Sequence, residues 1–133
     1  ACSTWFLPRI VSTGTALEWL YSGELIDAAE LKQRGFANEV CTPDELLDRA
    51  YAIARRIASF SPVAVALTRQ MLYRNAAQPH PMEAHRIDSL AVHHTSQGSG
   101  KEGIRAFLEK RPPRFTDTLS RDMPEFYPWW KSG

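Results

Sequence analysis

The sequence is poor in the features that mark several large classes of protein. Its 133 residues include only two cysteines, Cys2 and Cys41, too few for a disulfide-rich secreted scaffold and without the spacing of a zinc site. No stretch approaches the roughly 18 apolar residues that a membrane-spanning helix needs. No basic leader precedes an apolar run near the first residue. We therefore expect free thiols, no membrane partner and a cytoplasmic location.

Charge and residue spacing exclude further classes of site. Lys and Arg total 16 against 15 Asp and Glu, a net charge of +1, whereas a dedicated nucleic-acid-binding protein is strongly basic. The four histidines include no pair at i and i+4, the helical spacing of a metal-binding pair. The seven glycines are scattered, so no glycine-rich phosphate loop is present. From spacing alone we predict no metal site, no nucleic-acid partner and no catalytic residue.

Helix start signals divide the chain into short helices. Thr42-Pro43-Asp44-Glu45 combines an N-cap, a proline suited to the first helical position and a glutamate that can close a capping box. Ser61-Pro62 repeats the cap and the proline. The capping-box spacing recurs at Asp27 with Glu30 and at Ser99 with Glu102. We expect a helix to begin at each of these four signals.

Apolar periodicity assigns an inward face to three of these helices. The faces are Leu46, Ala50, Ile53 and Ile57 after Thr42; Val63, Leu67 and Met71 after Ser61; and Ile104, Phe107 and Leu108 after Ser99. Only residues 24–26 and 36–40 read as extended segments. The sequence therefore predicts a mainly α fold with at most two short strands.

A small basic cluster is the only feature that indicates an anionic partner. It consists of Lys101, Arg105, Lys110, Arg111 and Arg114. Within it, Phe107 and Lys110 stand at i and i+3 and would share one side of a helix, where the ring suits a nucleotide base and the ammonium a phosphate. The alternative is that Phe107 belongs to the core and Lys110 only complements the helix dipole. Spacing alone favours the alternative.

Several segments, taken in order, resemble the crotonase family of enoyl-CoA hydratases and isomerases. The segments are residues 3–9, 16–23, 26–40, 61–68 and 102–115. The resemblance covers about residues 1–116 and leaves residues 117–133 as an aromatic, proline-containing tail. It implies the helical C-terminal, oligomerisation part of the ClpP/crotonase-like fold, with the ββα spiral core missing.

The resemblance also implies chemistry on acyl-CoA thioesters. In the family, two backbone N–H groups stabilise the enolate and glutamates move the protons, which hydrates or shifts the α,β double bond. These groups would lie upstream of Ala1, so the resemblance assigns no catalytic residue here and no cofactor other than the coenzyme A of the substrate. Phe107 and Lys110 match positions that contact the CoA nucleotide. Ala1, Cys2 and Trp5 would line the acyl end of the pocket.

Three interpretations follow from these residues. The first is the C-terminal segment of an enoyl-CoA hydratase (a lyase) or isomerase of fatty acid metabolism, assembled into trimers or dimers of trimers. The second is a non-catalytic helical oligomerisation module. The third is a weak anion or RNA binder that uses the basic cluster between residues 101 and 114.

Overall fold

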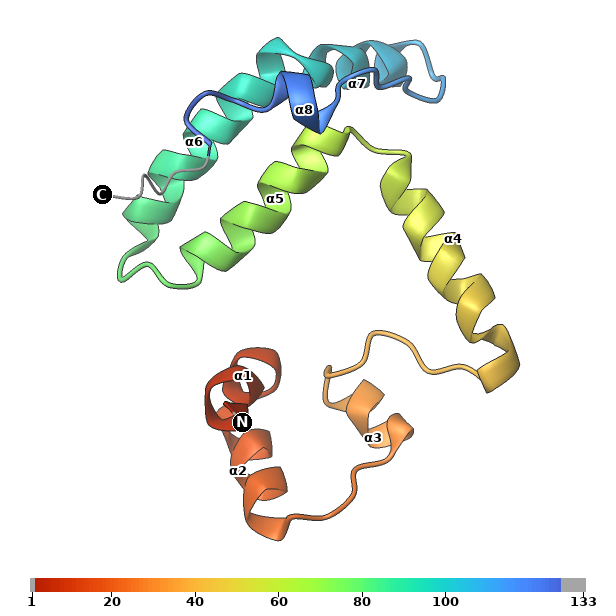
Figure 1. Ribbon diagram of the computed structural model, residues 1–133, viewed down its shortest axis with the longest axis vertical. Helices are drawn as coiled ribbons and strands as arrows, with labels where there is room; N and C mark the ends of the chain where they lie inside the picture. Colours follow the sequence, from red (N-terminus) through yellow and green to blue (C-terminus); the bar gives the residue numbers. More distant parts are fainter. Residues whose placement is uncertain (1, 128–133) are drawn as a thin grey trace. The chain divides into compact units, whose positions relative to one another are not determined.

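The computed structural model describes residues 2–127, and every regular element in that range is helical (Figure 1). The helices are α1 (Ser3–Ile10), α2 (Thr13–Ser22), α3 (Ala28–Gln33), α4 (Leu46–Ala58), α5 (Pro62–Asn75), α6 (Pro81–Gln97), α7 (Ser99–Leu108) and α8 (Leu119–Asp122), with a 3-10 turn, η1 (Pro43–Glu45), before α4. The predicted mainly α fold is confirmed. The segments 24–26 and 36–40 form no strand, because neither has a partner whose backbone completes a ladder.

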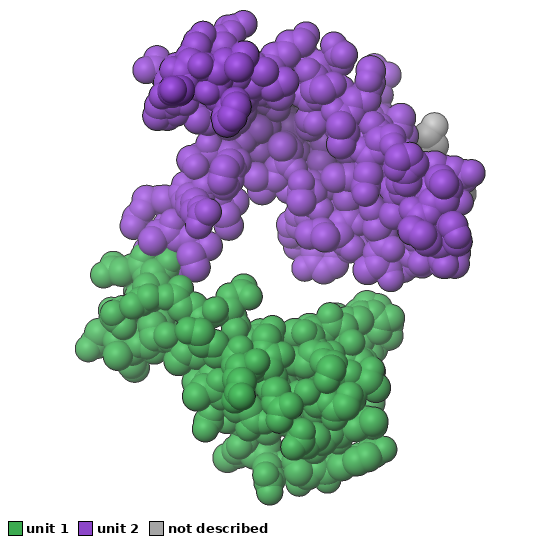
Figure 2. All heavy atoms as spheres, turned by 180° about the vertical axis from the view of Figure 1, so that it is seen from behind, with its two compact units in different colours: residues 1–49 green, residues 50–133 purple. Residues whose placement is uncertain are grey.

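The chain forms two compact units, residues 1–49 and residues 50–133 (Figure 2). The first unit has a small core in which Val11, Ala16 and Trp19 are buried. The Trp19 indole Nε1–H donates to Glu30 Oε1 over 3.0 Å and so links α2 to α3. Asp27 caps α3 by accepting the Glu30 N–H at 2.8 Å, as predicted. The predicted capping box is therefore only half formed: Asp27 accepts from the Glu30 N–H, but the Glu30 carboxylate binds Trp19.

The start of α4 follows its sequence signal. The Thr42 N–H donates to Glu45 Oε2 over 3.2 Å, which is the backbone half of a capping box. The face predicted to be inward is nevertheless open, because Leu46, Ile53 and Ile57 are 57%, 49% and 47% exposed. No residue of α4 is buried. The helix is amphipathic as predicted, but no described part of the chain buries its apolar face.

The second unit is built around α5 and α6, which pack side by side. Val63, Leu67 and Ala91 form its buried core, with Met71, Met123 and Tyr127 packed against them. The predicted inward face of α5 is therefore confirmed. Ser61 caps α5 by accepting the Ala64 N–H at 3.1 Å. The chain after α7 returns to this cap, where Asp117 accepts from Ser61 Oγ at 2.5 Å and from the Val63 N–H at 3.3 Å.

The last long helix, α7, differs from its prediction in two ways. Ser99 is its first helical residue and donates to Ser61 Oγ over 2.9 Å, so it does not form a capping box with Glu102. Its predicted inward residues Ile104, Phe107 and Leu108 are 62%, 82% and 72% exposed, and only Ala106 is buried. In α7, therefore, the small residue Ala106 packs against the rest of the chain, and the large apolar side chains are exposed.

The length and hydropathy of the helices bear on the expectation that the chain has no membrane-spanning segment. Within residues 2–127, no helix is both long and apolar enough to cross a bilayer.

Candidate functional site

The C-terminal end of α7 forms an unusual turn, which we call the α7 turn (residues 107–111). The Arg111 N–H donates to Ala106 O at 3.0 Å and the Lys110 N–H to Phe107 O at 3.2 Å, the two hydrogen bonds of a Schellman motif. Glycine usually occupies the left-handed position of this motif, but here it is Lys110, with φ 51°. A side chain in this conformation costs roughly 1–2 kcal/mol. Lys110 therefore lies beyond the helix, and the prediction that it shares a helical side with Phe107 was wrong.

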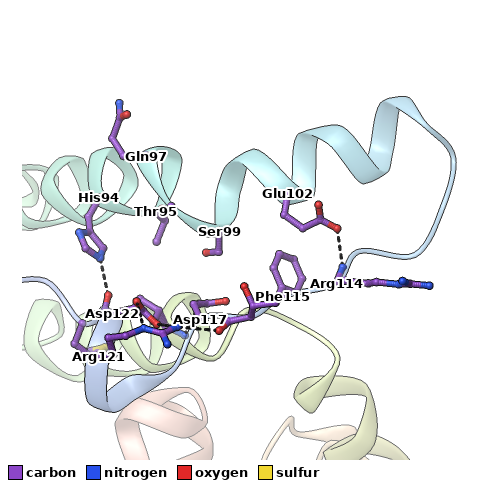
Figure 3. A pocket seen from close by; sticks show the side chains of 14 residues that line it. His94, Thr95, Gln97, Ser99, Glu102, Arg114, Phe115, Asp117, Arg121 and Asp122 are labelled. Carbon is purple, nitrogen blue, oxygen red and sulfur yellow. Dashed lines mark hydrogen bonds and ion pairs between the residues drawn. The ribbon is translucent and has the colours of Figure 1, made fainter.

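An ion-pair network centred on Glu102 and Arg111 stabilises the α7 turn. Arg111 Nη1 and Nη2 donate to the two carboxylate oxygens of Glu102 over 2.6 and 3.1 Å, and Arg111 Nε donates to Glu109 Oε2 over 2.5 Å. Glu102 also accepts the Arg114 N–H at 2.7 Å (Figure 3). The Arg111 fork, followed by the Arg114 N–H, lowers the pKa of Glu102 to about 2. The carboxylate is therefore charged throughout the physiological pH range.

The exposure of Phe107 bears on the two interpretations of this turn. Its ring is 82% exposed, so it does not belong to the core of this chain. Lys110 is also exposed, and no carboxylate within residues 2–127 forms an ion pair with its ammonium. Arg111, in contrast, is neutralised by Glu102 and Glu109. An open aromatic ring and an uncompensated ammonium on the same turn are groups that can accept a base and a phosphate.

The second group of predicted site residues lies in the first unit. Cys2 is exposed, has a free thiol and precedes α1 in a left-handed conformation with φ 65°. Trp5 is 53% exposed and meets Phe6 edge to face, with ring centroids 4.8 Å apart. The Arg9 guanidinium stacks 3.8 Å from the centroid of the Trp5 ring. Ala1 lies outside the described residues. Cys2 and Trp5 thus lie at one end of α1, with an open aromatic surface.

A pocket of about 580 Å³, which the sequence did not indicate, lies between the α6–α7 junction and the returning segment 114–123 (Figure 3). Its polar side chains hold that segment in place. His94 Nε2 bonds to Asp122 O over 2.9 Å, and Asp117 binds the start of α5. No local signal could have revealed these contacts, because Ser61 and Asp117 are 56 residues apart. Among the described residues, no cluster of His, Cys, Asp and Glu is arranged to hold a metal ion.

Comparison with known proteins identifies the family. A family model described as Enoyl-CoA hydratase/isomerase matches residues 1–118. The chain belongs to this family. Enoyl-CoA hydratase ACTT3 of Alternaria alternata is 37% identical over 128 residues, which cover 94% of this chain and 43% of the relative. Crotonyl-CoA hydratase of Syntrophomonas wolfei is 35% identical over 113 residues, which cover 82% and 42% of the two chains.

Solved structures of the enoyl-CoA hydratase family support the fold. The crystal structure of enoyl-CoA hydratase from Bacillus anthracis superposes with a TM-score of 0.77 at 32% identity. The match covers 85% of this chain and 44% of that structure. The chain thus spans less than half of the family members that it matches. Its helical character is consistent with the predicted C-terminal helical part of the crotonase fold.

Proposed function

We propose that this chain is the C-terminal segment of an enoyl-CoA hydratase or isomerase, and that its α7 turn binds the nucleotide end of the CoA thioester. The observation that carries the proposal is the pairing of an 82% exposed Phe107 with an exposed Lys110 that has no carboxylate partner within residues 2–127. In this proposal the ring covers the adenine base, while the ammonium neutralises a phosphate. Coenzyme A enters as part of the substrate, and no other cofactor is invoked.

The acyl end of the substrate is assigned to the first unit. Trp5 offers a half-exposed ring beside Phe6, which suits an apolar acyl chain, and Cys2 stands at the same end of α1. Ala1 belongs to the same proposed surface. These residues supply apolar contact and shape, not proton transfer.

The proton transfers and the oxyanion hole are assigned to residues upstream of Ala1. A general acid in this reaction needs a carboxyl whose pKa is raised toward neutrality. The carboxyls of Glu45, Glu102 and Asp122 have pKa values that shift the opposite way, each lowered first by a hydrogen bond from an arginine. They are therefore suited to holding the structure and not to donating protons. Hydration or isomerisation of the double bond would use the family's upstream glutamates.

Self-assembly is the second part of the proposal. Leu47 and Tyr51 on α4 are 68% and 59% exposed, and Ile104 and Leu108 on α7 are 62% and 72% exposed. Large apolar faces of this kind usually mark interaction surfaces. We infer that they pack against the upstream half of the enzyme and against neighbouring subunits in a trimer or a dimer of trimers. Sedimentation of the complete enzyme would test this, and a monomer would contradict it.

The location of the protein in the cell is also a proposal. We propose that the protein acts in the cytoplasm, in fatty acid metabolism. A human relative that is 36% identical over 107 residues is named a mitochondrial protein, which makes the mitochondrion the alternative. Cell fractionation with an antibody to this chain would decide between the two compartments.

Hydration of crotonyl-CoA tests the proposed activity. The enzyme that contains this chain together with its upstream residues should consume the α,β-unsaturated thioester, whereas the chain alone should not. Intact-mass measurement of the purified sample distinguishes the two. A sample at 15.0 kDa that hydrates crotonyl-CoA would contradict the upstream placement of the catalytic groups. A complete enzyme without hydratase or isomerase activity would instead support the non-catalytic oligomerisation module.

A further inference from the structure

The two residues that flank Lys110 in the sequence, Glu109 and Arg111, bind each other. Glu109 and Arg111 form an ion pair across it, with Arg111 Nε 2.5 Å from Glu109 Oε2. The same arginine extends back along α7 and binds both oxygens of Glu102. Lys110 is therefore the middle residue of a short segment whose two neighbours are fixed while its own ammonium stays available.

Glu102 holds the chain that follows the left-handed residue. It lies in the first turn of α7 and accepts hydrogen bonds from the Arg111 guanidinium, at the end of the α7 turn, and from the Arg114 N–H at 2.7 Å, three residues further along the chain. Its side chain is 21% exposed and that of Arg111 is 33% exposed, so the pair is partly shielded from water. This geometry fixes the backbone immediately after the left-handed residue.

We propose that Glu102 is a positioning residue for Lys110: through Arg111 and Arg114 it holds the left-handed α7 turn that presents the ammonium to the CoA nucleotide. The inference rests on the proposed function of the turn. Glu102 is not itself suited to contact the ligand, because it is an anion and would repel a phosphate. Its charge is instead balanced by Arg111.

The test uses two substrates in the complete enzyme. Crotonyl-CoA carries the nucleotide, whereas crotonyl-pantetheine is the same thioester without it. Glu102→Gln should raise KM for crotonyl-CoA roughly three- to tenfold, with kcat changed less than about twofold and KM for crotonyl-pantetheine unchanged. Glu83→Gln is the control, because it removes the same charge from a more exposed ion pair, with Arg86 at 2.9 Å, on α6 and outside the α7 turn. Its KM values should not change.

A double-mutant cycle separates positioning from general stability. Lys110→Ala alone should raise KM for crotonyl-CoA roughly tenfold, and Glu102→Gln should add nothing once Lys110 is gone. If Glu102→Gln does not fold, Arg111→Lys keeps the charge but loses the two-pronged contact, and it should show the same selective rise in KM.

The outcomes distinguish this inference from the proposed function. A normal KM for Lys110→Ala would remove the nucleotide assignment itself. A raised KM for Lys110→Ala with a normal KM for Glu102→Gln would overturn only the positioning role. The positioning role would also be overturned if Glu102→Gln impaired both thioesters equally, or if its effect added to that of Lys110→Ala.

Discussion

Replacing Lys110 by glycine should strengthen the fold and weaken substrate binding at the same time. The residue occupies the left-handed position that ends α7, where φ is 51°. Glycine adopts this conformation without a steric penalty, whereas lysine does not. The same substitution deletes the ammonium that we assign to the CoA phosphate. A single change therefore separates the conformational cost of this residue from its contribution to binding.

The size of the stability change follows from two opposing contributions. Relief of the left-handed conformation gains roughly 1–2 kcal/mol. The greater freedom of glycine in the unfolded chain costs about 0.4–1 kcal/mol. The free energy of unfolding should thus rise by about 0–1.6 kcal/mol, and the middle of that range, about 0.8 kcal/mol, corresponds to an increase in Tm of about 2–3 °C for a protein of this family's size. Affinity for a CoA ester should fall by about 1–2 kcal/mol, or roughly five- to thirtyfold.

Two measurements and two comparison variants make this a sharp test. Thermal unfolding gives the stability, and calorimetric titration with acetyl-CoA gives the affinity. Lys110→Ala removes the same ammonium but keeps a Cβ, so it should lose affinity without the gain in stability. Lys101→Gly is the matched control, because Lys101 is an exposed lysine inside α7. It should destabilise the protein by about 0.5–1 kcal/mol, since glycine is a poor helix former.

Two results would contradict these expectations for Lys110. If Lys110→Gly is no more stable than Lys110→Ala, the left-handed conformation carries no cost at this position. If both variants bind acetyl-CoA as well as the unchanged protein, the ammonium does not contact the substrate.

Three further predictions concern other residues. Phe107→Ala should reduce affinity for CoA esters roughly tenfold while changing the free energy of unfolding by less than about 0.5 kcal/mol, because the ring is 82% exposed; a large loss of stability in denaturant would show that it is buried in the assembled enzyme. Leu67→Ala should destabilise the protein by about 2–5 kcal/mol in urea unfolding, because Leu67 is 1% exposed; a change below about 1 kcal/mol would contradict its place in the core. The pKa of Glu102 is lowered from 4.5 to about 2, so its stabilising contribution is complete above about pH 4.5 and is lost as the pH falls toward 2. The difference in stability between Glu102→Gln and the unchanged protein should therefore be constant from pH 5 to pH 8 and shrink in acid, and a difference that changes near pH 7 would refute the assignment.

Local signals in the sequence predicted helix ends well where the cap and its partner are near neighbours. Ser61 caps α5 and Asp27 caps α3 as expected, since both bonds span three residues. The helix α1 was not predicted, because Pro8 lies inside it and usually interrupts a helix.

Sequence signals for helix ends gave wrong predictions where a residue further along the chain binds the same side chain. Glu102 has the spacing of a capping box with Ser99, but Arg111 offers it a charged two-pronged contact that is stronger than a neutral N–H. The left-handed turn at Lys110 was also hidden, because the usual glycine marker is absent.

Apolar periodicity predicted which residues share a face but not what covers the face. Both α5 and α7 carry apolar residues at helical spacing, yet Leu67 is 1% exposed and Leu108 is 72% exposed. The difference comes from tertiary packing, which the spacing of apolar residues does not encode. The exposure of the site residues Phe107 and Trp5 likewise required the structure.

The bond between Asp117 and the start of α5 closes a loop without a covalent link. Because Ser61 and Asp117 are joined, the chain from the start of α5 to the returning segment forms a closed loop, which the Ser99–Ser61 and His94–Asp122 bonds also cross-link. Ser61→Ala would remove one of the two bonds that Asp117 makes to the start of α5, and should therefore loosen the returning segment 114–123.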